Sequence, residues 1–236
     1  MGVKLRGRGK IAYKWIDKKV GNLLDIGCAS GYFTVYFKNK AKKVYGVDVK
    51  NEMIDEAKKL YPEIKFFVIK SEKLPFNSNM FDVVTILDVL EHVKDDKKMI
   101  TEIDRILKKD GLLIMSVPHK GLFTFLEPDY IKTSIPSVYK LFYFLIKRRK
   151  PQINSYIHKH YSLMEINKLT KNKFEIINLH IGGSILSTIL SYIEILFLRL
   201  FNRNYLYNLL TPIKNFDYSI NYGKFGDNLI IKAKKI

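Results

Sequence analysis

A turn with two glycines and a later acidic residue are spaced as a nucleoside-binding site requires. Residues 23–32 combine an apolar run, an aspartate (Asp25) and a turn that carries Gly27 and Gly31. Glycine adopts positive φ angles without strain and lets a ligand approach the backbone closely. Asp48 closes the next apolar run, where its carboxylate can accept hydrogen bonds from both hydroxyls of a ribose. The pattern predicts that a nucleoside binds beyond the carboxyl ends of these two strands.

The elements that must position this site alternate along the first 118 residues. Near-continuous apolar runs, typical of strands buried on both faces, cover residues 22–27, 43–48, 64–69, 81–87 and 112–117. Helical patterns cover residues 10–19, 32–39, 52–60 and 94–108. Because strands and helices alternate, we predict a parallel sheet that is covered by helices.

One helix and two further strands are expected later in the chain. Ser162 and Glu165 are spaced as a capping box, which predicts a helix over residues 162–170. Apolar runs predict strands over residues 174–181 and 226–234. No internal repeat or low-complexity linker divides the chain, so we expect one domain.

The glycine spacing is not that of the dinucleotide fingerprint, because an acidic residue stands two positions before Gly27 and the glycines are four apart. This motif resembles the first motif of class I, Rossmann-like, S-adenosylmethionine-dependent methyltransferases. Further matches to that family follow in the expected order at residues 74–76, 81–84, 88–93 and 105–118. The resemblance covers residues 10–118 well, and residues 158–181 and 226–234 more loosely.

The resemblance implies a fold, a cofactor and an activity. The fold is α/β, with a doubly wound, mostly parallel sheet of seven strands whose last strand, 226–234, runs antiparallel beside 174–181. The cofactor is S-adenosylmethionine and the activity is methyl transfer. The residues expected to line the cofactor site are Asp25, Gly27, Cys28, Ala29, Gly31, Asp48, Val49, Ser71, Glu72 and Leu87.

Two positions depart from the family pattern. Ala29 stands where the middle glycine is usual, and Lys70 stands where the family has an aspartate that binds the adenine amine. An ammonium group donates to adenine ring nitrogens but cannot accept from the amine. Ser71, Glu72 or a backbone carbonyl is left to take that role. Cys28 is expected to be a small filler of the turn rather than a nucleophile.

Histidines are the candidate bases, because an oxygen acceptor has to lose a proton and imidazole titrates near neutral pH. His119 directly follows the fifth expected strand, at the carboxyl edge of the sheet, and is the first choice. His92 follows the fourth strand and is the second choice, with packing in that loop as the alternative. His158 and His160 precede the late helix.

Composition narrows the class of protein. Hydrophobic residues make up 47% and charged residues 27% of the 236 residues, which excludes a disordered chain, a collagen-like chain and a small disulfide scaffold. The net charge of +18 attracts polyanions such as nucleic acid and anionic lipid headgroups. Cys28 is the single cysteine, so an intrachain disulfide and a multi-cysteine metal site are excluded, and no metal ligands are predicted. The first residues lack the apolar segment of a secretory signal, so we expect a cytoplasmic protein.

Two insertions, at about residues 119–157 and 182–225, are expected to define the substrate of the predicted single domain, 1–236. Apolar stripes over residues 136–150 and 184–201 predict amphipathic helices, and four cations end the first of them at residues 147–150. Such helices suit a membrane interface, or else they pack on each other as a cap over the site. A membrane-spanning helix is disfavoured by the charged Glu194 and Arg199.

We therefore expect a methyltransferase that acts on a small or lipid-linked hydrophobic acceptor, in the cytoplasm and peripherally at an anionic membrane surface. Two alternatives stay open. The net charge also suits an RNA methyltransferase, although the sequence has no N/D-P-P-Y tetrad and no added RNA-binding module, which makes nucleic acid the less favoured partner. Ala29 and Lys70 keep open a non-catalytic protein that binds the cofactor. The acceptor atom and the oligomeric state are left undetermined.

Overall fold

The computed structural model describes residues 5–126, 130, 135, 137, 140, 158–197 and 203–236. Its strands are β1 Val20–Ile26, β2 Ala41–Asp48, β3 Lys65–Val68, β4 Phe81–Leu87, β5 Leu107–Pro118, β6 Phe174–Gly182 and β7 Asn228–Lys235. Its α-helices are α1 Gly7–Lys14, α2 Asn51–Leu60, α3 Asp96–Ile106, α6 Leu163–Thr170, α7 Ile185–Phe197 and α8 Arg203–Asp217. Short 3₁₀ helices are η1 Thr34–Asn39, η2 Leu90–His92, η3 Thr124–Leu126 and η4 Gly223–Phe225.

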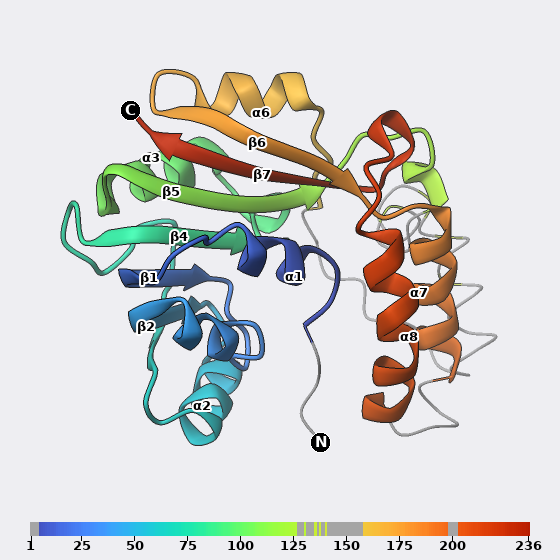
Figure 1. Cartoon of the computed structure of the whole chain (residues 1–236), viewed down its shortest axis with the longest axis horizontal. Coiled ribbons are helices and arrows are strands. Elements are labelled where there is room, and N and C mark those ends of the chain that lie inside the picture. Colours follow the sequence, from blue (N-terminus) through green and yellow to red (C-terminus); the bar gives the residue numbers. More distant parts are fainter. Residues whose placement is uncertain are drawn as a thin grey trace.

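All seven strands form one sheet in the order β3-β2-β1-β4-β5-β7-β6 (Figure 1). The first five strands are parallel to one another, and β7 lies antiparallel between β5 and β6. The strand order reverses beside β1, which pairs with β2 on one side and β4 on the other. The predicted fold class, the antiparallel last strand and the position of the reversal are confirmed.

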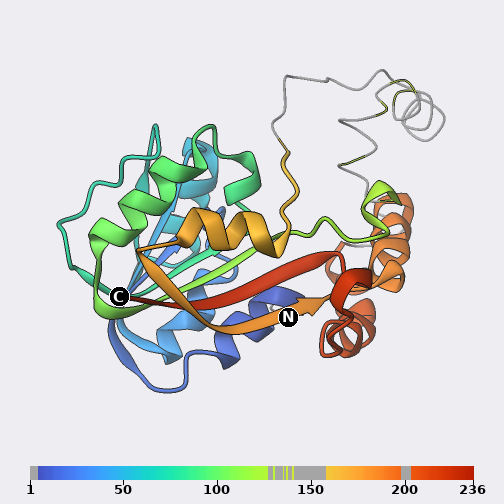
Figure 2. The ribbon, with the colours of Figure 1, turned by 90° about the horizontal axis from the view of Figure 1, so that it is seen from above.

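Helices cover both faces of the sheet, and each face has its own apolar core (Figure 2). Leu24 packs into the core that α3 and α6 cover, whereas its neighbour Leu23 packs into the core that α1 and α2 cover. Both side chains are fully buried. Burial on both faces explains why the strands read as continuous apolar runs rather than as alternating ones.

Several helix boundaries differ from the prediction. The expected helix over 94–108 is shorter, because the side chain of Asp95 accepts the Lys98 N–H at 3.0 Å and caps the helix at that point, while β5 begins at Leu107. The expected helix over 32–39 is the 3₁₀ helix η1, and the expected helix over 10–19 is α1, which starts and ends earlier.

The second predicted insertion contains the helices α7 and α8, which lie side by side beyond the carboxyl ends of the parallel strands (Figures 1 and 2). Leu190 of α7 packs against Leu210 of α8. Other residues of the predicted apolar stripe are not buried, because Leu186 and Ile189 are exposed. None of the described helices has both the length and the apolar content to cross a bilayer.

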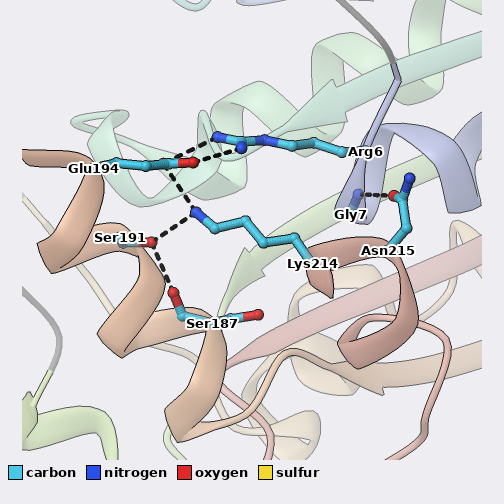
Figure 3. A network of polar contacts seen from close by, with 7 residues as sticks. All are labelled: Arg6, Gly7, Ser187, Ser191, Glu194, Lys214 and Asn215. Carbon is cyan, nitrogen blue, oxygen red and sulfur yellow. Dashed lines mark hydrogen bonds and ion pairs between the residues drawn. The ribbon is translucent and has the colours of Figure 1, made fainter. Parts of the chain in front are cut away.

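Polar contacts join this hairpin to the start of α1 (Figure 3). Arg6 Nη1 donates to Glu194 Oε1 at 2.6 Å, and Lys214 Nζ donates to Glu194 Oε2 at 2.9 Å. Burial acts to raise the pKa of the Glu194 carboxyl, but the hydrogen bonds from the two cations lower it below its ordinary value. The Gly7 N–H donates to Asn215 Oδ1 at 3.0 Å. The polar side of α7 is therefore turned inward.

The first predicted insertion is described only in part. Residues 119–126 continue from β5, and the Tyr192 hydroxyl of α7 donates to the Leu126 carbonyl at 2.9 Å. The predicted apolar stripe over 136–150 falls, apart from positions 137 and 140, outside the described residues, as do the four cations at 147–150. The division into one domain with two insertions stays a prediction.

Candidate active site

The turn after β1 is fixed by backbone geometry. The N–H groups of Gly27 and Cys28 both donate to the Val47 carbonyl of β2, at 2.8 and 3.0 Å. Gly27 has a φ of +75°, and a Cβ atom there would lie 2.1 Å from a methyl carbon of Val89. This position therefore requires glycine. Ala29 also has a positive φ, +46°, which costs an alanine roughly 1–2 kcal/mol.

Asp25 supports this turn from behind. Its carboxylate is 4% exposed and accepts hydrogen bonds from the hydroxyls of Thr34, at 2.6 Å, and Thr85, at 2.7 Å. Burial raises the pKa of the Asp25 carboxyl to about 6, although both hydroxyl groups act to lower it. The residue thus joins β1, β4 and η1 directly beneath the turn.

Asp48 lies at the carboxyl end of β2 and faces the turn. Its Oδ2 accepts the Ala29 N–H at 2.9 Å, and its Oδ1 accepts the Lys50 N–H at 3.0 Å. A carboxylate has about four acceptor sites, so each oxygen retains one for a hydroxyl group. The two backbone contacts fix the orientation of the Asp48 carboxylate.

A cavity of about 580 Å³ opens in front of this turn. It is lined by Ile26, Gly27, Asp48, Val49, Lys50, Ile69, Lys70, Ser71, Glu72, Asp88, Val89, His92, Val93, Lys94 and Met99. Five residues from the sequence prediction are among them: Gly27, Asp48, Val49, Ser71 and Glu72.

The other five predicted cofactor residues lie around the cavity rather than in its described wall. Asp25, Cys28 and Gly31 are buried behind the turn, while Ala29 is exposed on it and Leu87 ends β4. Burial also raises the pKa of the Cys28 thiol far above its ordinary value, which fits a filler rather than a nucleophile. All ten assignments stay predictions.

A second cavity, of about 660 Å³, adjoins the first. It is lined by Arg6, Gly7, Arg8, Tyr32, Phe33, Asp88, Glu91, His92, Pro118, His158, Ser187, Thr188, Ser191, Glu194, Lys214, Tyr218, Asp227 and Asn228. Asp88 and His92 line both cavities, so the two spaces meet at these side chains. Asp88 pairs with Arg8 and accepts the Ser116 hydroxyl at 2.7 Å.

The structure separates the two candidate bases. His92 lines both cavities, and its Nε2 lies 3.8 Å from Glu91 Oε1. His119 is buried, and its Nδ1 donates to the Gly226 carbonyl at 3.0 Å, which ties β5 to η4. The described residues that line the two cavities do not include His119.

Several side chains of the second cavity were not identified from the sequence. Arg6 and Arg8 come from the start of the chain, and Lys214 comes from α8. Basic residues are common throughout this sequence, so no local pattern distinguished these three. Glu91 is adjacent to the predicted His92, but the sequence alone did not reveal that the Glu91 side chain is buried.

Comparisons with known proteins find methyltransferases. Residues 24–115 match a family model described as "Methyltransferase domain". A ubiquinone/menaquinone biosynthesis C-methyltransferase of Rickettsia typhi is 33% identical over 132 residues, which is 50% of this chain and 53% of that protein. The corresponding Campylobacter jejuni protein is 28% identical over 132 residues, or 51% of this chain and 56% of that protein. The chain thus spans about half the length of these curated relatives.

Two solved structures share the fold over almost the whole chain. The YcgJ protein of Bacillus subtilis has a TM-score of 0.56 at 19% identity and covers 97% of this chain and 95% of its own. A geranyl diphosphate C-methyltransferase from Streptomyces coelicolor, solved with Mg²⁺, geranyl diphosphate and S-adenosyl-L-homocysteine, has a TM-score of 0.63 at 12% identity, covering 97% and 77%. At these sequence identities, both comparisons show a shared fold.

Residues 24–115 match a methyltransferase domain, and the seven-stranded sheet has the fold of class I methyltransferases. S-adenosylmethionine is the cofactor of the methyltransferases that this part of the chain resembles.

Replacement of Asp48 by alanine is expected to weaken cofactor binding. The ribose hydroxyls would lose their acceptor, at a cost of about 1–3 kcal/mol. Calorimetry with S-adenosylhomocysteine measures the change, and Asp55→Ala, an exposed aspartate on α2, is the matched control. Unchanged affinity in a folded Asp48→Ala chain would contradict the ribose assignment.

The Asp25 carboxyl is expected to make stability depend on pH. Its pKa of about 6 in the folded chain exceeds the ordinary value of 3.8, so the folded state binds more protons between about pH 4 and 6. The free energy of unfolding should therefore fall as pH rises through this window, by up to about 3 kcal/mol. Urea unfolding of the wild type and of Asp25→Asn at several pH values isolates this contribution. A difference between the two chains that stays constant with pH would show that Asp25 titrates normally.

Proposed function

We propose that this chain transfers the methyl group of S-adenosylmethionine to a small or lipid-linked acceptor that enters the second cavity. The observation that carries the proposal is the junction of the two cavities at Asp88 and His92. A cofactor whose ribose binds Asp48 would occupy the first cavity, and its methyl group would have to leave through this junction. The second cavity is then the space from which an acceptor approaches.

Alignment supplies most of the catalysis in this proposal. The sulfonium methyl is already electrophilic, and holding the acceptor in line with it supplies roughly 7–11 kcal/mol. An oxygen acceptor must also lose a proton, and His92 is the better-supported base because it lines both cavities. His119, the first choice from the sequence, is instead proposed to position the loop that its Nδ1 contacts.

The surroundings of the second cavity favour an amphipathic acceptor. The cavity wall carries three cations, Arg6, Arg8 and Lys214, which pair with carboxylates of the same wall. The hairpin beside it leaves large apolar side chains exposed, namely Ile185, Leu186, Ile189, Leu209, Ile213 and Phe216. We therefore propose that a polar head of the acceptor enters the cavity and that an apolar tail follows the hairpin. The names of the curated relatives, and geranyl diphosphate in one structural neighbour, support an isoprenoid-like acceptor.

An anionic membrane surface is the proposed place of action. Exposed apolar side chains and a net charge of +18 are the two features that bind peripheral proteins to anionic lipid. Because a lipid-linked acceptor lies in the membrane, the exposed hairpin would bring the cavity to its substrate.

Transfer of a labelled methyl group tests the activity. The full chain is incubated with S-adenosylmethionine labelled in its methyl group and, separately, with lipid, small-metabolite and RNA fractions. Label is expected in the lipid or small-metabolite fraction, and Asp48→Ala should slow its appearance. Label in RNA alone would favour an RNA methyltransferase, and binding of the cofactor without any transfer would favour a non-catalytic protein.

Vesicle binding tests the membrane surface. Replacement of the four cations at 147–150 by glutamine should weaken binding to phosphatidylserine vesicles by about 1 kcal/mol per charge and leave cofactor affinity unchanged. The matched control replaces four exposed lysines on the sheet and on α2, Lys42, Lys43, Lys58 and Lys59. Equal losses in both variants, or no vesicle binding by the parent chain, would contradict a specific membrane-facing surface.

A further inference from the structure

Three potential metal ligands converge on the wall where the two cavities meet. They are Glu91, His92 and His158, whose donor atoms all lie within 4.8 Å of one another. Glu91 is only 1% exposed, and the rings of His92 and His158 lie 5.2 Å apart between centroids. All three side chains line the second cavity.

Hydrogen bonds join the two segments that supply these ligands. The Lys159 N–H donates to the Glu91 carbonyl at 3.1 Å, which places His158 beside η2. The Tyr161 hydroxyl donates to the Leu90 carbonyl at 3.3 Å. These contacts join η2 to the residues that precede α6, so the arrangement is part of the fold rather than a chance meeting of surface side chains.

The donor set has the chemistry of a metal centre. Two imidazoles and one carboxylate on one side of a cavity bind divalent transition-metal ions and leave positions open for other ligands. We propose that Glu91, His92 and His158 bind a divalent transition-metal ion such as Zn²⁺, Mn²⁺ or Fe²⁺.

The present distances require only a small closure. Bonds of about 2.1 Å at tetrahedral angles place donor atoms roughly 3.4 Å apart. Because all donor atoms lie within 4.8 Å of one another, side-chain rotation has to bring no pair together by more than about 1.4 Å. His92 is exposed and His158 is half-buried, which leaves room for this rotation.

This inference deepens the proposed function and rests on it for the role of the ion. His92 is then a metal ligand, in place of the base that takes the acceptor proton. An acceptor hydroxyl that occupies an open position on the ion would lose its proton to water more readily, because the ion stabilises the alkoxide or phenolate. The oxygen then forms a bond to the methyl carbon while the bond from that carbon to sulfur breaks, which yields the methyl ether and S-adenosylhomocysteine. The site therefore favours an acceptor with an oxygen nucleophile.

Metal binding is measured on the full, untagged chain after removal of metal ions with a chelator, with neither cofactor nor acceptor present. Titration with Co²⁺, followed by its visible absorption, and calorimetry with Zn²⁺ should each give one site per chain. Glu91→Gln, His92→Ala and His158→Ala should each weaken the affinity for the metal ion by more than about tenfold. Loss of a mere hydrogen-bond partner of a metal ligand already costs about that much, so loss of a ligand should cost more. His160→Ala, which removes a histidine beside the cluster but not from it, should retain the affinity of the parent chain.

Two results would overturn the metal site: no saturable binding by the parent chain, or the same affinity in all four variants. Circular dichroism verifies that each variant is folded, and calorimetry with S-adenosylhomocysteine is run on the parent chain. This calorimetry separates the two proposals. Cofactor binding without metal binding overturns the metal site alone, whereas metal binding without cofactor binding overturns the proposed methyl transfer and leaves the metal site standing.

Discussion

Strand β1 is hydrogen-bonded to β2 on one side and to β4 on the other, and both neighbours run parallel to it. The chain therefore continues from β1 to β2 on one side and later adds β4 on the other side. The connections after β1 and β4 diverge at the carboxyl end of β1. Asp25 holds this point by accepting hydroxyl hydrogen bonds from η1 and β4. The turn at Gly27, the orientation of Asp48 and the first cavity all depend on this arrangement.

The hairpin of α7 and α8 determines the character of the second cavity. An amphipathic helix usually turns its apolar side toward the protein, but α7 directs Ser187, Ser191 and Glu194 inward (Figure 3). Arg6 and Lys214 make this possible, because they supply charges that balance the enclosed carboxylate. The consequence is a space with polar walls beside a helix pair with exposed apolar side chains.

Local patterns predicted the sheet because its strands are buried on both faces, and strand β1 with Leu23 and Leu24 is the clearest example. The same is true of Asp48, whose place depends only on the end of one strand. The orientation of α7 could not be predicted in this way, since Arg6 and Glu194 are separated by 188 residues. The meeting of His92 with His158 is equally non-local, and it depends on a backbone contact between η2 and residues before α6. Periodicity reports which face of an element is apolar, but not which distant charge will compensate its polar face.

The antiparallel insertion of β7 between β5 and β6 has a consequence for the order of folding. Strand β6 is hydrogen-bonded to β7 and is made before it, so β6 has no partner in the sheet until α7, α8 and β7 have followed. Synthesis therefore leaves two unpaired strand edges, on β5 and β6, which are prone to pair with other chains. Asn228 at the start of β7 donates to Asp88 at 3.3 Å and lines the second cavity. The wall of that cavity is thus completed only when β7 pairs with β5 and β6. The chain can therefore bind an acceptor there only after this last step of folding.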